Sequence, residues 1–500
     1  MKIYNFRYII FVFTLLITWS CKKDFLDKQP LDALSKATFW KTQKDIDMAL
    51  ATCYASFNND LTGQAQFGSG SAHWDGLTDN GNTPYPWEQD FTGVARGNIE
   101  AQKWGVATGM WYTCYNGIAK CNVLLDNVKN VKDIPAETLK RYMGEAIFLR
   151  SFWYNDLTQL YGDCPLLLHV LTIEESKVVK RTPKAEVVAQ ILKDLDEAIS
   201  YLPDVSYNGH VVKASAQALK ARVCLYNKMW AEAATAAKAV MDNTLFSLTP
   251  DYDYAGMFNG ASQNGNKEIL FSVEYLLPNI WHGIKYIHSM WFSIVPLQDL
   301  VDSYEKLPGW DPAYPYEKRD PRLKLTVYTK GDPFPYLSNP DNKFDPAKVN
   351  TTTQFALHKF ITAPVIGYPQ DDADIIHIRL ADVMLMYAEA MFMDGKGDDP
   401  NALKAVNDVR GRFKGILPPL TRLTEDAIRH ERRVELAFEG GLRFFDLRRW
   451  RIAHIVMNNL IDPVAANGKY SFANPKNYLW PIPQAEMDIM GSGFGQNPEY

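Results

Sequence analysis

The sequence predicts a mainly α-helical protein in which helical hairpins pack into one globule, with long aromatic-rich loops and a few short strands. Three observations predict this class. Apolar residues recur at steps of three and four residues, which is the period of an amphipathic helix. Two stretches carry small residues on both sides of a turn, and two others lack a helical period. With 500 residues, of which 47% are hydrophobic, the chain can bury a large core.

The chain opens on an apolar block of 13 residues, 8–20, that stops within "LLITWSCKKDFLDKQP". A helix that spans a bilayer needs about 20 residues, so this block is too short to be a transmembrane anchor. Lys2 and Arg7 precede it, as in a secretion signal. We therefore predict a signal peptide over residues 1–20.

Cys21 directly follows the predicted cleavage point, which is where a bacterial lipoprotein carries its acyl chains. Such chains anchor a protein without a helix, because each buried CH₂ contributes about 0.8 kcal/mol. In the alternative, a plain secreted protein, Cys21 is incidental. We favour lipidation of Cys21 because the polar tether "KKD" follows at once.

Three helices with one apolar face each are predicted next. The second ends at "YGDCP", and Thr182 with Pro183 predicts a cap and a first helical position for the third. We expect the tryptophans on these faces, Trp111 and Trp153, to be core residues. The faces consist of Trp111, Tyr115, Ile118, Cys121, Leu125 and Val128, then Leu139, Tyr142, Ala146, Leu149, Trp153, Leu157 and Leu160, then Val188, Ile191, Leu195, Ile199 and Leu202.

Residues 213–242 and 378–413 predict two close-packed helical hairpins of the tetratricopeptide type, the second with Gly395 and Gly397 in its turn. They do not recur at a strict 34-residue period, so hairpins built into one globule fit better than a regular solenoid. The predicted helical scaffold covers about 31–250 and 375–460.

Two stretches resist the helical pattern, residues 67–104 and about 251–374. Both are rich in Gly, Pro, Asn and aromatic residues, and the second contains strand-like pieces such as "EILFSVEYL" and "LKLTVY". Loops this long in a compact protein are usually functional or disordered, and the tryptophan content argues against disorder. We expect a binding region here.

Charge and cysteine usage exclude several classes of function. The net charge of −5 without a basic stripe argues against a nucleic-acid partner. Apart from Cys21, five scattered cysteines show no disulfide framework and no zinc spacing, and we expect buried thiols. "QDDAD", 370–374, lacks the spacing of a calcium loop and is expected to be a solvated turn. No metal or cofactor is predicted.

Several motifs resemble one family. "DFLDKQP" follows Cys21, and "SIVPLQDLVDSYE", "KRDPRLKLTVY", "IRLADVMLMYAEA" and "RHERRVELAFEGGLRFFDLRRW" follow in order, before the chain closes on "QNPEY". Together they resemble the SusD/RagB family of outer-membrane lipoproteins of Bacteroidota, over residues 21–500.

The resemblance implies one SusD-like domain with tetratricopeptide-like hairpins, anchored by lipid in the outer membrane and facing the cell exterior. It implies non-catalytic capture of an oligosaccharide or polysaccharide. It also implies a partner, a TonB-dependent SusC-like transporter on which the protein sits as a lid.

The most distinctive motif, residues 424–441, is expected to be structural. Thr424 caps a helix, and Arg432 with Glu435, and Glu439 with Arg443, can pair within one turn. An anion or sugar site built from arginines is the alternative. "HERRV" lacks the second histidine of a zinc protease motif.

Candidate glycan-binding residues come from the two loop stretches. The C–H face of a pyranose packs on a flat aromatic ring, and its hydroxyl edge needs short polar side chains. "HWDGLTDN" and "YPWEQ" supply this mixture, and further aromatic residues lie in the second stretch. The candidates are Trp74, Asp75, Asp79, Asn80, Trp87, Trp281, Trp291, Trp310 and Tyr314.

Two other functions are weighed against glycan binding. A glycoside hydrolase needs two carboxyl groups about 5 to 9.5 Å apart, and no stretch singles out such a pair. A helical-repeat adaptor that binds protein alone needs no set of exposed tryptophans.

Overall fold

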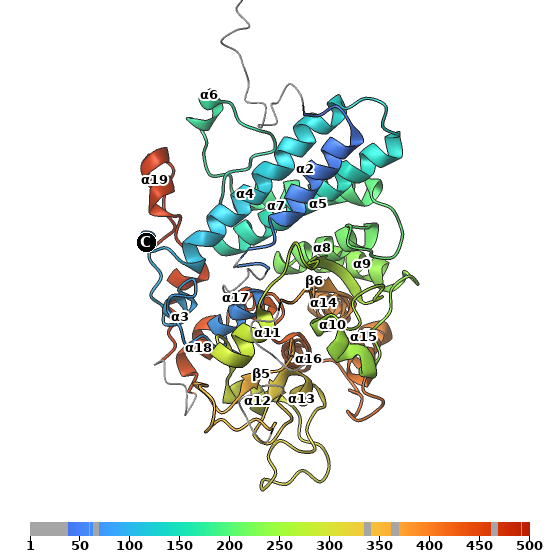
Figure 1. The fold of residues 1–500 in the computed structure, drawn as a ribbon, viewed down its shortest axis with the longest axis vertical. Coiled ribbons are helices and arrows are strands. Elements are labelled where there is room, and N and C mark those ends of the chain that lie inside the picture. Colours follow the sequence, from blue (N-terminus) through green and yellow to red (C-terminus); the bar gives the residue numbers. More distant parts are fainter. Residues whose placement is uncertain are drawn as a thin grey trace, which may run out of the picture.

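The computed structural model describes residues 39–59, 61–63, 70–334, 342–361, 370–461, 469–491 and 493–500. The predicted signal peptide and Cys21 lie outside these ranges. Within them the fold is mainly helical with a few short strands (Figure 1), as predicted. None of the helices described is both long and apolar enough to cross a bilayer.

Four helices form a layer at one end of the molecule (Figure 1): α2 (Gln43–Ala55), α4 (Val106–Asn127), α5 (Ala136–Tyr161) and α7 (Lys184–Tyr201). α5 packs between α4 and α7. The three predicted apolar faces belong to α4, α5 and α7. Trp111 and Trp153 are buried in the main core, as expected from their helical spacing.

The start of α7 differs from the prediction. Pro183 occupies the cap position, and the Asp163 carboxylate accepts a hydrogen bond from the Lys184 N–H at 2.8 Å. Thr182 instead pairs through its backbone with Cys164, at 3.0 and 3.2 Å. The capping group therefore comes from a preceding segment, which local sequence does not reveal.

Both predicted hairpins are present. The first is α8 (Lys213–Tyr226) with α9 (Trp230–Met241), and the second is α14 (Leu380–Met391) with α15 (Pro400–Gly411). The turn of the second includes Gly395 at φ +75°, a conformation that favours glycine. This pair begins after Ile378, because β6 (Ile375–Arg379) is a strand that pairs antiparallel with β2 (Ile269–Val273).

The strands form three small antiparallel pairs. β2 confirms the strand predicted from "EILFSVEYL", whereas "LKLTVY" divides between a helical turn, α13 (Arg322–Thr326), and β4 (Val327–Tyr328). β4 pairs with β5 (Ala356–Leu357), and β1 (Gly81–Asn82) pairs with β3 (Val295–Pro296). The remaining elements are η2 (Ser71–Leu77), α3 (Phe91–Ala95), η3 (Val128–Asn130), α6 (Ile173–Ser176), η4 (Asp251–Asp253), α10 (Tyr254–Asn259), α11 (Ile284–Tyr286), η5 (Ile287–Trp291), α12 (Gln298–Ser303), η6 (Phe392–Lys396), α18 (Ala453–Asn459), η7 (Lys476–Tyr478) and α19 (Gln484–Met490).

A buried network of ion pairs surrounds α16 (Glu425–Leu436) and α17 (Leu442–Arg449). The predicted cap is confirmed, since the Thr424 hydroxyl accepts a hydrogen bond from the Ala427 N–H at 3.1 Å. The structural interpretation of this motif holds, but the predicted pairs within one turn are wrong, because these side chains point inward to other elements. The observed contacts are Arg432 with Asp382 and Asp446, Glu435 with Arg322, Arg379 and Arg412, Glu439 with Lys359 and Arg379, and Arg443 with Asp79.

The Glu435 carboxylate shows how this network is stabilised. Burial alone would raise its pKa, but Arg412, Arg379 and Arg322 outweigh burial and hold the pKa well below its usual range. Side chains from four parts of the chain are thus fixed around one buried charge. The five cysteines of the described ranges are buried free thiols, as expected.

Candidate functional site

The candidates in the stretch "HWDGLTDN" are interior residues. Trp74 is only 3% exposed, and its indole N–H donates to the carbonyl of Leu61 at 2.7 Å. Its ring stacks against those of Trp480 and Phe445, with centroids 5.7 and 5.8 Å apart. The expectation of a sugar platform at Trp74 is therefore wrong: η2 turns this indole into the core.

The polar residues that follow Trp74 are buried too. Asp79 accepts hydrogen bonds from Arg443 at 2.9 and 2.7 Å and lies 3.1 Å from Arg433. Burial would raise the pKa of Asp79, but Arg433 and Arg443 lower it to about 2. The Asn80 amide donates to Asp75 at 2.6 Å, and burial raises the pKa of Asp75 to about 7.

Asp79 and Asn80 therefore tie the loop after η2 to α16 and α17, and Asp75 holds the Asn80 amide, so none of the three reaches a ligand on the surface. Each of them is buried. This corrects the prediction that they face sugar hydroxyls. The physical reason is that the arginines of the C-terminal motif need buried acceptors, and Asp79 and Asn80 supply them.

An aromatic platform does exist, in a neighbouring loop. Trp87 is 71% exposed and stacks on Tyr85, with centroids 4.8 Å apart and ring planes 20° apart. Trp291, 49% exposed, meets the same Tyr85 edge to face at 6.4 Å. We call Tyr85, Trp87 and Trp291 the aromatic platform.

Two contacts bring the halves of the platform together. The Tyr85 hydroxyl donates to the backbone carbonyl of Trp291 at 2.8 Å. In the sequence, β1 lies just before Tyr85 and β3 lies just after Trp291. These two strands pair with each other, which aligns Asn82 with Val295. Both tryptophans were candidates from the sequence, but Tyr85 was not, although this residue stands in the "YPWEQ" stretch.

The acidic side chains beside Trp87 face other side chains of the protein. Glu88 is largely buried, and its Oε2 lies 3.4 Å from Nε2 of the fully buried His73. Asp90 forms an ion pair with Lys103 at 2.7 Å. The chemistry that the platform offers is therefore stacking against flat C–H faces.

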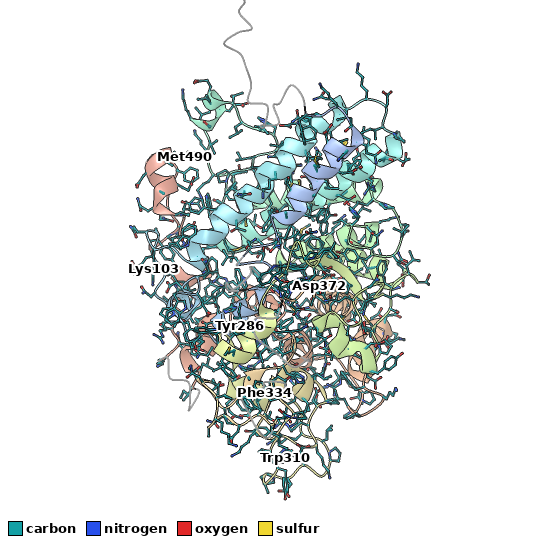
Figure 2. The ribbon with its side chains drawn as sticks, in the orientation of Figure 1. Lys103, Tyr286, Trp310, Phe334, Asp372 and Met490 are labelled. Carbon is teal, nitrogen blue, oxygen red and sulfur yellow. The ribbon has the colours of Figure 1, made fainter. Side chains whose placement is uncertain are left out.

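Trp310 and its neighbour Tyr314 lie apart from η5, the element that carries Trp291 (Figure 2). Figure 2 shows Trp310 at the lower end of the molecule, far below Tyr286, the residue that precedes η5. Trp310 is half-buried, with the Lys306 ammonium 3.9 Å from its ring centre, and Tyr314 beside it is exposed. Trp281 is half-buried in the loop before α11.

One group in the described ranges has the donors for a metal ion, namely Glu305, His430 and Glu431. The Arg410 guanidinium lies between its carboxylates, 2.7 Å from Glu305 and 2.8 Å from Glu431. Arg410 therefore supplies the positive charge between these two carboxylates. The expectation of a solvated turn at "QDDAD" is wrong, because Asp371 is buried, bridges to His282 through its backbone and pairs with Lys285 at 3.1 Å. Asp374 accepts a hydrogen bond from the Tyr275 N–H at 2.9 Å.

Fold and site together define a class of protein: a helical scaffold that displays an aromatic platform on its loops. Residues 252–500 match the model described as the SusD family, and residues 24–225 match a model described as starch-binding associating with outer membrane. The chain belongs to the SusD/RagB family.

Relatives and solved structures of this family align over nearly the whole chain. SusD-like protein P2 of Formosa agariphila is 25% identical over all of both chains, and SusD-like protein P38 of the same organism is 27% identical over 91% of this chain and 93% of its own. The structure of a SusD-like carbohydrate binding protein from Bacteroides fragilis is 28% identical, has a TM-score of 0.79, and covers 90% of this chain and 99% of its own.

Proposed function

We propose that the protein binds an oligosaccharide or polysaccharide at the aromatic platform, at the surface of the outer membrane. The observation that carries this proposal is the exposure of Trp87 and Trp291 on either side of Tyr85. An indole costs free energy when its ring faces water, so exposed tryptophans held rigidly in one place indicate a ligand with an apolar face. A pyranose has such a face.

The fixed geometry of the platform also favours binding. Tyr85 bonds the Trp291 carbonyl, and the β1–β3 pair holds the two segments together. A preorganised site loses little side-chain entropy when ligand arrives. Affinity at one such site is expected to be weak, and several copies on a polymer raise retention through effective concentration.

The proposed role is binding without hydrolysis. A glycosidase needs two carboxyl groups about 5 to 9.5 Å apart on either side of the bond that is cut. Of the acids beside Trp87, Glu88 faces His73 and Asp90 faces Lys103, which supports a binding protein. Slow release of reducing ends from a bound polysaccharide would instead favour a hydrolase.

The proposed setting is the outer face of the membrane, with a lipid on Cys21 and a SusC-like TonB-dependent transporter as the recipient of the glycan. The match to a model of proteins that associate with the outer membrane supports this setting. Changing Cys21 to Ala should release the protein from the membrane fraction. Co-purification of a barrel transporter with the lipidated protein tests the partner.

Affinity electrophoresis on a polysaccharide panel tests the platform. Trp87→Ala and Trp291→Ala should each weaken retention by about tenfold on the polymer that binds, and Tyr252→Ala, a change to an exposed aromatic residue of η4, should not. Trp281, Trp310 and Tyr314 stay predictions, and their alanine variants belong in the same panel. Unchanged retention in both platform variants would contradict the proposal.

A further inference from the structure

A second aromatic pair, the exposed Trp104 and the half-buried Tyr112, lies beside a large cleft that Tyr112 lines. The cleft, of about 570 Å³, lies between α4, α19 and the segment that follows α5, and it is within the size range of small-ligand sites. Figure 1 shows α19 standing beside α4, and Figure 2 labels Met490 in α19 with Lys103 below it.

Trp104 and Tyr112 repeat the arrangement of the aromatic platform. Trp104 is 66% exposed and lies nearly parallel to Tyr112, with centroids 6.0 Å apart and ring planes 22° apart. Tyr112 lines the cleft, and Trp111 and Tyr115 continue the aromatic wall along the same helix. As at Tyr85 and Trp87, an exposed indole is supported from behind by a tyrosine ring.

The cleft also holds polar side chains that an apolar partner would leave unsatisfied. Within the described part of the chain, the Asn116 amide and the Glu486 carboxylate line the cleft and have no recorded side-chain hydrogen bond. Burial raises the pKa of Glu486. Covering such groups with an apolar surface is unfavourable because they lose their hydrogen bonds to water, whereas sugar hydroxyls can bond both.

Three further polar side chains of the lining, Asn122, His169 and Ser176, are each within hydrogen-bond distance of a backbone carbonyl. Apolar side chains of the lining include Ile118, Val123, Val170 and Ile489. An unsubstituted sugar would place hydroxyl groups against these side chains without partners. A methyl or acetyl substituent would instead bury apolar surface there, which is favourable because that surface is removed from water.

We infer that Trp104, Tyr112 and this cleft form a second carbohydrate-binding site, separate from the aromatic platform, for a sugar ring that carries an apolar substituent. The ring packs on Trp104, which Tyr112 supports from behind, its hydroxyls meet Asn116 and Glu486, and its substituent enters the cleft. The inference rests on the proposed glycan-binding function.

Calorimetry on the intact chain tests this site with paired oligosaccharides that differ only in O-methyl or acetyl groups. Trp104→Ala should weaken binding of the substituted ligand about tenfold, and Trp87→Ala should leave this second binding event in place. Val123→Trp, which fills the cleft and keeps Trp104, should abolish the preference for the substituted ligand. Tyr252→Ala is the matched exposed control.

The outcomes separate the two proposals. If Trp87→Ala weakens binding while Trp104→Ala and Val123→Trp do not, the platform stands and the second site is overturned. If no glycan binds, both are overturned. If Trp104→Ala leaves glycan binding unchanged but alters self-association in sedimentation, the cleft is a protein contact, and the inference is wrong.

Discussion

The Tyr85 hydroxyl donates a hydrogen bond of 2.8 Å to the backbone carbonyl of Trp291, although 206 positions separate these residues in the sequence. The same tyrosine ring stacks on Trp87. Tyr85 thus links the two exposed indoles into one surface. The Tyr85 ring is part of the binding surface, and the Tyr85 hydroxyl positions Trp291. A substitution that removes only the hydroxyl separates these two roles.

Tyr85→Phe removes the hydroxyl and keeps the ring. A typical hydrogen bond contributes about 0.5–1.5 kcal/mol, so glycan affinity should fall by roughly two- to tenfold as Trp291 loses its tether. Calorimetry with a bound oligosaccharide measures this loss. Tyr252→Phe serves as the control, and affinity equal to wild type in Tyr85→Phe would show that the tether is unimportant.

Trp74→Ala should act on stability. Removing a buried tryptophan from its stack on Trp480 costs about 3–5 kcal/mol. Denaturant unfolding should show this loss, while the folded fraction retains glycan with normal affinity at the platform. Loss of binding without loss of stability would restore Trp74 as a ligand contact.

Asp79→Ala leaves the Arg443 guanidinium without its buried carboxylate partner, whereas Arg433 keeps Asn80 and Asp299. Breaking a buried ion pair on one side costs about 3–5 kcal/mol, because the remaining charge stays out of water. The free energy of unfolding should fall by this amount at pH 7. A variant as stable as wild type would contradict the structural role assigned to Asp79.

Asp374 makes stability depend on pH. Burial, and then the charge of Glu274, raise its pKa from 3.8 to about 8. Between pH 4 and 8 the folded state therefore holds a proton that the unfolded state releases, so this group's contribution to stability decreases as pH rises through that window. Asp374→Asn, which stays neutral, should flatten the decline of Tm between pH 6 and 8. An unchanged slope would show that Asp374 is ionised in the folded protein.

Helical periodicity predicted α4, α5 and α7 and both hairpins, because each buries one face of a regular repeat. It could not predict the cap of α7, because Asp163 reaches Lys184 from another segment. Helical periodicity likewise could not predict the ion pairs of α16, because the partner residues are distant in sequence.

The candidate site was predicted less well, for a physical reason. A tryptophan flanked by Gly and Asp is equally suited to a loop surface and to a core that needs tight turns. Trp74 is the second case, and Gly441 packs directly against its ring, where a Cβ would lie 3.0 Å from a side-chain atom. Trp87 and Trp291 share one surface because β1 and β3 bring their loops together, a pairing that no local pattern predicts.

A crystal structure of the protein with the oligosaccharide that it retains best tests the central claim most directly. We predict a sugar ring lying flat on Trp87 or Trp291, with its carbon atoms about 4 Å from the indole plane. A ligand bound elsewhere, with both indoles facing solvent, would contradict the account.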